Sequence, residues 1–482
     1  MSTKLFASDA AIFVALFVLF GAAICFVRPP YQLSDEANSF ARVWQVSEGI
    51  FVSPVGTQDE VSRSLTGDNR KSFGWVNRSP EAATEKLFTA NVPAALVPDE
   101  FMFDVRDDVS GFKFSFADMQ KFLSTPLNVD VRETGLIPNT GAYAPPVYLP
   151  QAAAAFVGRK LNLSAGEIFY LVRLSALLFV ATCLFWSMKL LPEARHVMFV
   201  LAMSPMFLTE SGSASADAVT FGLSFLATAW LLSMRDRREK FSRAEVVGLI
   251  LLSAWLACAK SVYGTILLLY FLLPRERGGS SAKFFALGAL LLAVNLATSL
   301  LWTEFAFSSG AIPATSRQYL GVDFDVDAKK IFVVEHPLEI LSMTVDTLEV
   351  GALYYLLSFI GVLGVNGDVF LPLPFYLPYI FGLTVLTLHG EFRPKVFERA
   401  LMLFAVSVTT LAFFVAEFVI WTEPDAQFIR GVQGRYFLPL APMFLCALTC
   451  RKPLRHPKLI AAVVGTFAAA VTIFALIDEF AC

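Results

Sequence analysis

The chain has 482 residues, of which 56% are hydrophobic and only 16% are charged. Soluble domains carry about 25% charged residues, and several apolar runs here exceed the roughly 18 residues that indicate a transmembrane helix. The composition therefore predicts a polytopic membrane protein, and a net charge of −3 gives no sign of nucleic-acid binding. Six cysteines, most of them inside apolar runs and without Cys-x-x-Cys spacing, predict neither a disulfide nor a metal cage.

The first part of the chain predicts one transmembrane helix and one extramembrane unit. Residues 1–28 contain an apolar run from about Asp9 to Val27, which is long for the alternative reading as a cleavable signal peptide. Residues 29–163 are rich in Pro, Asn, Asp and Ser and predict a large mixed extracytoplasmic loop unit. Within it, "KSFGWVNRSPEAATEKLFTA" suggests a helix. The unit either binds the acceptor or covers the site as a lid, or it serves only as a structural cap.

Hydrophobic runs follow closely in the rest of the chain. Residues 164–304 predict transmembrane helices 2–7, residues 305–370 an outer loop with one ambiguous segment, and residues 371–482 the C-terminal helices. The expected spans after the first are Gly166–Leu191, His196–Thr209, Ala216–Ser233, Val246–Lys260, Tyr263–Leu273, Phe284–Trp302, Leu371–Leu388, Ala400–Trp421, Tyr436–Leu448 and Leu459–Leu476. We therefore expect an all-α polytopic membrane protein with about eleven transmembrane helices.

Basic loops set the expected direction of the spans. The loops "MRDRREKFSR", "PRERGG", "EFRPKVFER" and "RKPLRHPK" are rich in Lys and Arg, and such loops stay in the cytoplasm. This orientation places the N-terminus inside and residues 29–163 outside. It also requires an odd number of crossings between Trp302 and Arg393. The ambiguous run Leu348–Val365 is therefore expected to be re-entrant, which membrane proteins tolerate where protein or a wet cavity covers the backbone.

With this orientation, ionisable and polar residues collect at the outer membrane boundary. Such residues are costly at membrane depth and default to a functional interpretation. The adjacent acids Asp35 and Glu36, just after the first span, are the candidate catalytic residues. The candidate substrate-binding residues are Arg42, Tyr143, Tyr148, Gln151, Arg159, Asp217, Lys260, Arg430, Gln433, Arg435 and Tyr436.

This set of residues suits transfer of a group from a lipid phosphate. A carboxylate can accept the proton of an attacking hydroxyl, while Lys and Arg can stabilise the phosphate that leaves. Arg binds phosphate oxygens through its planar fork, and Lys acts as a point charge. The glycines around Arg435 would let the backbone approach a head group closely.

Each candidate also has a purely structural interpretation. The acid pair can cap a helix that begins near Glu36, and Lys260 can extend to the interface without binding a ligand. Asp217 can act with Ser215 as the N-cap of the next helix. The arginines can anchor anionic lipid head groups, and the tyrosines can belong to the interfacial aromatic belt. The functional interpretation depends on the whole set.

Five segments in order resemble a known family. They are "SDEANSFARVWQVSEG", "YAPPVYLPQA", "SPMFLTESGSASADAVTFGLSFL", "AKSVYG" and "GVQGRYFLPLAP". The pattern is similar to that of bacterial polytopic membrane proteins grouped as a domain of unknown function, which in turn resemble the GT-C class of membrane glycosyltransferases. The chain departs from this pattern at Ser34, Asn38 and Ser261, where the family has Pro, His and Pro.

The resemblance implies a GT-C-like fold and a function. Enzymes of this class take a sugar from a polyprenyl-phosphate donor and work on the outer face of the membrane. Asp35 would be the base, and Glu36 would orient the acceptor or share that task. Lys260, Arg430 and Arg435 would hold the lipid phosphate. Asp217 would occupy the place of a second acidic motif, which is sometimes a metal ligand.

The expected reaction is a single displacement that inverts the anomeric centre, with an envelope glycan or glycolipid as acceptor. No cofactor is expected, and a divalent cation is possible but not favoured. Expected partners are the lipid bilayer, the donor, the acceptor and any proteins that make or flip the donor. The expected location is the bacterial inner membrane, with the site facing the periplasm or exterior.

Three other functions remain open. A lipid-linked sugar transporter or flippase is one, although transporters often contain internal repeats and none is evident here. A non-enzymatic membrane protein of envelope assembly is another. A ligase or polymerase that uses a diphosphate-linked glycan is the third, but its expected outer histidine could only be His336, which has no evident partner in the sequence.

Overall fold

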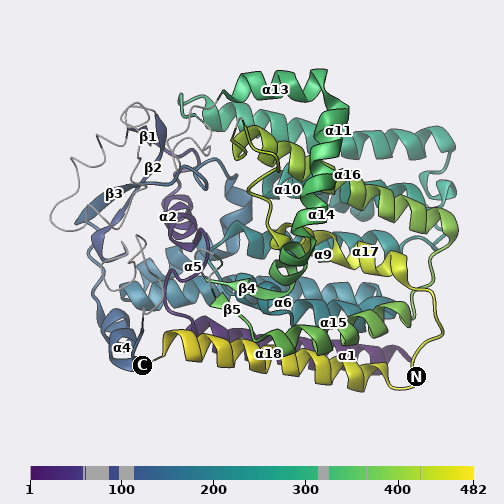
Figure 1. Cartoon of the computed structure of the whole chain (residues 1–482), viewed down its shortest axis with the longest axis horizontal. Coiled ribbons are helices and arrows are strands. Elements are labelled where there is room, and N and C mark those ends of the chain that lie inside the picture. The colour runs from purple at the N-terminus through teal and green to yellow at the C-terminus, as the bar shows by residue number, and fades with distance from the viewer. Residues whose placement is uncertain are drawn as a thin grey trace.

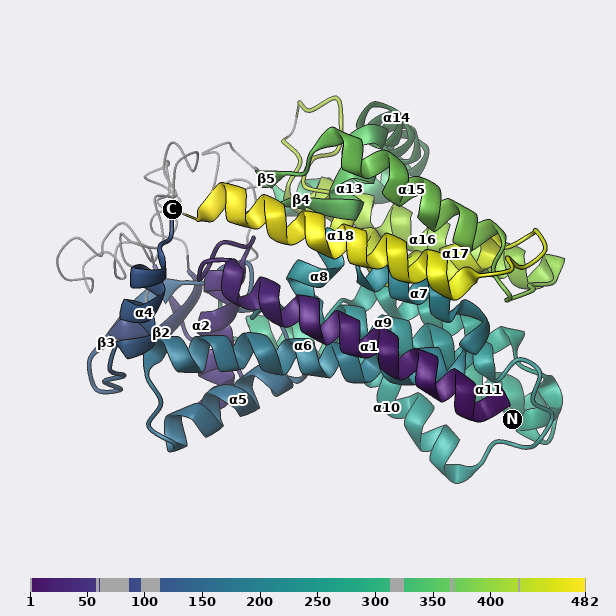
Figure 2. The same ribbon diagram turned by 90° about the horizontal axis from the view of Figure 1, so that it is seen from below.

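The computed structural model describes residues 2–57, 60, 86–96, 113–312, 325–364, 367, 369–423 and 425–481, with side chains from residue 9 onward. Most of these residues are helical, and the long helices lie roughly parallel to one another (Figure 1). Elements of the N-terminal extramembrane unit gather at one end of the bundle together with the C-terminus. The N-terminus lies at the opposite end (Figures 1 and 2).

Among the described residues, seven helices are long and apolar enough to cross a membrane. They are α1 (Ser2–Val27), α6 (Ala165–Leu190), α9 (Ala216–Ser233), α11 (Ser281–Phe307), α14 (Pro337–Gly361), α16 (Val396–Ile420) and α18 (Pro457–Phe480). The expected membrane protein is thus confirmed at the level of an apolar helical bundle. Six of these helices correspond to spans expected from the sequence, and α14 is the exception.

The remaining expected spans form shorter or broken elements. They are α7 (Arg195–Ala202) followed by α8 (Pro205–Ser211), α10 (Arg243–Ala259), η6 (Ser261–Leu272), α15 (Leu373–Leu388), and η8 (Gly434–Leu440) followed by α17 (Ala441–Leu448). The η elements are 3₁₀ helices, which rise about 2 Å per residue, so a short η6 still covers a length of about 24 Å. Sequence periodicity does not distinguish this tighter helix from an α-helix.

Of the run expected to be re-entrant, residues 348–361 belong to the continuous helix α14, which is preceded by α13 (Val326–Glu335). A two-stranded hairpin of β4 (Val362–Leu363) and β5 (Val369–Phe370) follows it. Figure 1 shows α14 lying across the parallel helices, and Figure 2 shows it nearly end-on. The re-entrant prediction is therefore replaced by a crosswise helix that follows a different direction from the bundle.

The described part of residues 29–163 contains both helices and short strands. It contains α2 (Glu36–Ser47), β1 (Val55–Gly56), β2 (Leu87–Pro93), η3 (Ala94–Leu96), α4 (Phe116–Ser124), β3 (Arg132–Leu136), η4 (Pro145–Tyr148) and α5 (Leu149–Lys160). The strands form an antiparallel sheet in the order β1-β2-β3. The expected helix over residues 71–90 is wrong for residues 87–90, which begin strand β2, and its residues 71–85 lie outside the described part of the chain.

Caps and small residues explain several of the helix positions. Ser164 and Ser242 begin α6 and α10 with capping boxes, each of which satisfies two backbone donors. A Cβ at Gly21 of α1 would lie 2.5 Å from a side-chain atom of Leu177 in α6. Small residues at such crossings let membrane helices pack closely, so α1 and α6 pack directly against each other.

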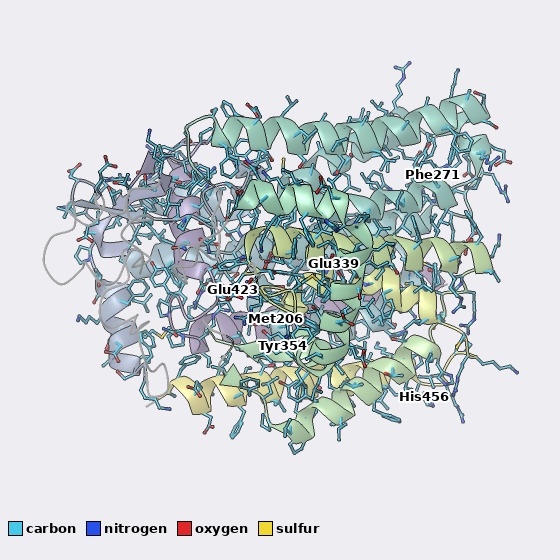
Figure 3. All side chains as sticks on the ribbon, turned by 45° about the horizontal axis from the view of Figure 1, so that its top comes forward. Met206, Phe271, Glu339, Tyr354, Glu423 and His456 are labelled. Atoms are coloured by element: carbon cyan, nitrogen blue, oxygen red, sulfur yellow. The ribbon has the colours of Figure 1, made fainter. Side chains whose placement is uncertain are left out.

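The two ends of the bundle differ in the residues they carry. Two short 3₁₀ helices lie in loops at the end of the bundle opposite the sheet. They are η5 (Pro192–Ala194) and η7 (Arg275–Gly278). Figure 3 places Phe271 and His456 at that end, well separated along the bundle from Glu423. The four basic loops expected in the cytoplasm belong to this end, whereas α2 and the sheet define the other.

Candidate functional site

Arg435 is the centre of a charged cluster at the end of the bundle that carries α2. Its Nη1 donates to Glu210 Oε1 at 2.8 Å, and its Nη2 donates to Asp35 Oδ2 at 3.2 Å. Its Nε lies 3.7 Å from Asp217 Oδ2. The side chain of Arg435 is only 6% exposed. Segments far apart in the sequence therefore meet at one guanidinium, as the sequence predicted for Asp35, Asp217 and Arg435.

A close contact with α14 places Arg435. The backbone N–H of Gly434 donates to Ser358 Oγ at 3.0 Å. A Cβ at Gly434 would lie 2.2 Å from the backbone nitrogen of Phe359, so only glycine fits at this position. The crosswise helix α14 thus fixes the chain immediately before the arginine.

Lys260 joins the same cluster from a break between two helices. The helix α10 ends at Ala259, and Lys260 has extended backbone angles before η6 begins. Lys260 Nζ lies 2.9 Å from Asp217 Oδ1 and 4.6 Å from the centre of the Tyr436 ring. The lysine is therefore paired with a carboxylate and an aromatic face. A lysine that only extends to the membrane interface would need neither partner.

The Asp217 carboxylate contacts the charged cluster and does not cap its helix. Ser215, and not Asp217, caps α9, because the Ser215 hydroxyl accepts from the Asp217 backbone N–H at 3.1 Å. Gln151 helps to hold this turn, since its Nε2 donates to the Ser215 carbonyl at 3.2 Å. Gln151 itself is fully buried.

Asp35 is the most accessible acid of the cluster. It stands at the N-cap of α2 with φ of 63°, a left-handed conformation that is uncommon outside glycine. Its Oδ1 accepts a short hydrogen bond from Asn139 Nδ2, and Asn38 Nδ2 donates to Asn139 Oδ1 at 2.7 Å. The Asp35 side chain is 36% exposed. Asn38, at the position of the family's histidine, thus orients the amide that holds Asp35.

Glu36 does not belong to the reactive face of the cluster. It is fully buried, and its carboxylate accepts from Arg173 at 2.6 Å and from Arg28 at 3.1 Å. Guanidinium groups hold both carboxylate oxygens of Glu36 in the core. The Asp35 side chain, by contrast, is partly exposed. The two pairs of Glu36 fix α2 against α1 and α6, which gives Glu36 a structural role; its catalytic role stays a prediction.

The two arginine partners of Glu36 were missed by the sequence interpretation. Arg173 lies in the middle of "YLVRLSALL" on α6 and also donates to the carbonyls of Cys25, Arg28 and Pro29. An arginine in the interior of an apolar helix almost always has a buried partner, and this signal was available from the sequence alone.

Two further candidates hold the extramembrane unit together. Arg42 is fully buried and donates to Gln45 Oε1 and to the carbonyls of Ile50, Phe51 and Tyr143. Arg159 donates to the Ser47 carbonyl at 2.8 Å and pairs with Glu48 at 3.1 Å. Their donors are directed to α2 and its loop, and not to the Arg435 cluster.

The aromatic candidates lie beside the cluster. Tyr143 is half-buried, and its ring is 6.5 Å from that of buried Tyr148. Burial raises the pKa of Tyr143, while the charges of Lys260 and Asp217 also act on it. Its hydroxyl therefore stays protonated near neutral pH and can donate a hydrogen bond. Tyr436 stacks on Phe413 with ring centres 5.5 Å apart.

The remaining two candidates occupy the loop before η8. Arg430 is exposed and pairs with Glu423 at 3.0 Å, so it lies outside the cluster around Arg435. Gln433 precedes η8, and its carbonyl accepts from the Tyr436 backbone N–H at 3.1 Å. Arg435 and Tyr436 in η8 thus belong to the cluster, whereas Arg430 in the preceding loop pairs with Glu423.

Glu210 is the main cluster residue absent from the expected substrate-binding set. It is fully buried in α8 and receives one hydrogen bond from Arg435. With Asp35 and Asp217 it makes three carboxylates that lie within 3.7 Å of a nitrogen of Arg435 or Lys260 in the described structure, against two cations. Like charges at such distances favour retention of a proton on one of them.

The charged cluster can therefore accept a proton, donate hydrogen bonds and pair with an anion. No group of three or more His, Cys, Asp or Glu side chains among the described residues is arranged to hold a metal ion. The expectation that the site works without a metal remains a prediction. Chemically, the cluster combines an accessible carboxylate with a guanidinium and an ammonium group.

Fold and site together define a polytopic helical membrane protein with a buried charged cluster at one end of its bundle. A family profile described as a predicted membrane protein (DUF2142) matches residues 110–444, and the chain belongs to this family. The matched range contains Glu210, Asp217, Lys260 and Arg435 but begins after Asp35. The family part of the resemblance is confirmed, and its likeness to GT-C enzymes stays a prediction. No curated protein and no solved structure matches the chain.

Proposed function

We propose that the protein is a GT-C-type membrane glycosyltransferase. It transfers a sugar from a polyprenyl-phosphate donor to a hydroxyl of an envelope glycan or glycolipid. The observation that carries the proposal is the pairing of Arg435 with Asp35 at 3.2 Å, beside Lys260. One accessible acid and two cations from distant segments form the minimum set for this chemistry.

Asp35 acts as the general base in this reaction. It accepts the proton of the acceptor hydroxyl, whose oxygen forms a bond to the anomeric carbon. The bond between that carbon and the phosphate oxygen breaks, and its electron pair leaves with the polyprenyl phosphate. One displacement inverts the anomeric centre. A retaining reaction would require a carboxylate nucleophile beside the sugar, and Glu36 is turned away from that position.

Arg435 and Lys260 stabilise the leaving phosphate. Both cations are paired with carboxylates in the described structure, so an incoming phosphate takes over some of their donors. Arg435 suits this exchange because its guanidinium has five N–H donors in a fixed plane. Once Arg435 turns to the phosphate, Asp35 Oδ2 is free to accept a hydrogen bond from the acceptor hydroxyl.

The proposed location is the bacterial inner membrane, with the cluster on the outer side. The basic loops at the opposite end of the bundle support this orientation. The partners are the donor lipid, the glycan or glycolipid acceptor and the proteins that make or flip the donor. No cofactor is proposed.

A transfer assay in proteoliposomes tests the proposal. Polyprenyl-phosphate sugars of several kinds are offered, and release of free polyprenyl phosphate is measured for the wild type, Asp35→Asn and Glu48→Gln. We expect Asp35→Asn to lower the rate by about 10²–10⁴-fold, as for loss of a general base. Glu48, which pairs with Arg132 and Arg159 away from the cluster, is the matched control and keeps its activity.

A lipid-linked sugar transporter is the second candidate. It is supported by the chain breaks at Lys260 and before η8, because transporters often bind substrates at discontinuous helices. In the same proteoliposomes, labelled lipid would cross the bilayer without any release of polyprenyl phosphate. That outcome would reject the transferase, and Asp35 would then belong to a gate.

A further inference from the structure

Glu417 is a buried acid whose side chain takes no part in the pairs described above. It lies in the last turns of α16 and is 7% exposed. Its Oε2 has no hydrogen-bond partner among the described residues. An enclosed carboxylate oxygen without a partner loses the hydrogen bonds it would make with water. Each such atom in a folded protein requires an explanation, and an absent ligand is one.

The loop that leads to Arg435 leaves space for this carboxylate. Gly431 has φ of +92°, and a Cβ there would lie 2.4 Å from Glu417 Oε2. The loop is fixed around it, because the Thr422 hydroxyl donates to the Glu417 carbonyl and accepts from the Arg430 backbone N–H. A glycine thus allows the acid to remain beside the loop without a covering side chain.

The acid lies on the aromatic side of the proposed phosphate site. Glu417 follows Phe413 by four residues on α16, and residues four apart lie on the same face of a helix. Tyr436 stacks on Phe413 and lies under the Lys260 ammonium group. A molecule that contacts both the basic pair and Glu417 therefore passes along this aromatic side.

The chemistry of the surroundings selects the ligand. Lys260 and Arg435 disfavour a cation beside Glu417, because like charges repel. A second phosphate would be repelled by the carboxylate itself. A neutral group with several hydroxyls fits both conditions, since a carboxylate accepts strong hydrogen bonds from O–H donors. Aromatic rings add an apolar face for a sugar ring.

We propose that Glu417 binds hydroxyls of the sugar in a polyprenyl-phosphate sugar, next to the phosphate held by Arg435 and Lys260. This inference rests on the proposed function and assigns its sugar subsite to the α16 side of the cluster. Asp35 then lies on the other side of Arg435, where the acceptor arrives. Glu417 binds and orients the sugar and does not transfer a proton.

Two lipid probes separate the sugar from the phosphate. Binding of decaprenyl phosphate and of decaprenyl-phosphoryl glucose, mannose and arabinose is measured with purified full-length protein. Glu417→Gln keeps the size of the side chain but removes its charge. We expect this variant to bind at least one sugar-bearing probe about tenfold more weakly, the loss of one charged hydrogen bond. Binding of bare decaprenyl phosphate stays unchanged.

Glu423→Gln is the matched control, because Glu423 follows the same helix α16 (Val396–Ile420) by three residues but pairs with exposed Arg430. It leaves both kinds of probe unaffected. If Glu417→Gln does not fold, Glu417→Asp keeps the charge but withdraws the oxygens, and it is measured with the same probes. Thermal unfolding in detergent establishes that each variant is folded.

The outcomes distinguish this inference from the proposed function. If a folded Glu417 variant loses both kinds of probe equally, or neither, sugar binding by Glu417 is rejected while lipid-phosphate binding stands. If the wild type binds no lipid phosphate at all, the proposed function fails, and the subsite fails with it. Selective loss of a sugar-bearing probe supports the inference.

Discussion

At the scale of single residues, charge pairs of different kinds surround α2. Glu36 is enclosed by Arg28 and Arg173 and fixes the helix, while its neighbour Asp35 reaches Arg435 and remains partly exposed. Two adjacent acids therefore have different roles because successive helical residues point in different directions. The sequence indicates the acid pair but not this division of roles.

Removal of the Glu36 charge tests the structural role. Glu36→Gln leaves two buried arginines without their carboxylate, and breaking a buried ion pair in this way costs about 3–5 kcal/mol. We expect a clear fall in the midpoint of thermal unfolding in detergent. Glu48→Gln, in the more exposed pair with Arg132, changes the midpoint far less. Equal stability of wild type and Glu36→Gln would contradict this role.

Two arginines of one loop provide a matched pair for the phosphate site. Arg435→Lys keeps the charge but loses the planar donors, and we expect transfer to fall by about 10²–10³-fold. Arg430→Lys, in the exposed pair with Glu423, leaves transfer nearly unchanged. Initial rates with a polyprenyl-phosphate sugar compare the two, and an equal effect of both substitutions would argue against Arg435 as the phosphate ligand.

At the scale of elements, the crosswise helix α14 supports the loop that carries the key arginine. Ser358 accepts from Gly434, and the Thr347 hydroxyl accepts from the Ile429 backbone N–H at 2.9 Å. α14 thus holds this loop at two points. The side-chain bonds run between residues that are far apart in the sequence, so hydrophobic periodicity alone cannot reveal them.

A methyl group at Gly434 tests this support. Because a Cβ would lie 2.2 Å from a backbone atom of Phe359, Gly434→Ala displaces either the loop or α14. We expect transfer activity to fall by more than about tenfold, a loss of at least 1.4 kcal/mol in transition-state stabilisation. Gly390→Ala, whose Cβ would be 3.2 Å from its nearest neighbour at Thr449, serves as control and retains activity.

At the scale of the whole molecule, the sequence predicted a bundle of apolar helices but not the type and direction of every helix. Apolar runs of about 18 residues or more gave reliable helices, since burial in lipid requires internal hydrogen bonds. The 3₁₀ helix η6 and the crosswise α14 were not foreseen, because their geometry depends on neighbours such as Asn295 against Gly264 and Pro205 against Gly361. In the site, Asn139 gave no local signal, whereas Glu417 stands in an apolar run as Arg173 does.

The direction of the bundle can be measured directly. Cys450 is exposed at the end with the basic loops, and Ser124 is exposed at the end with the sheet. In a Cys482→Ser background, a membrane-impermeant maleimide added to intact cells is expected to leave Cys450 unlabelled. We expect the same reagent to label a Ser124→Cys variant in intact cells, and to label Cys450 only in inverted vesicles. The reverse pattern would place the charged cluster in the cytoplasm.

The bond between Arg435 and Asp35 joins residues that are 400 positions apart. At about 5–20 residues per second, a ribosome makes the intervening chain in roughly 20 to 80 seconds. Throughout that time the first acid has already been made, but its arginine has not. The pair is therefore completed only after Arg435 has been made, so a chain cut short before that residue carries Asp35 without the guanidinium that holds it.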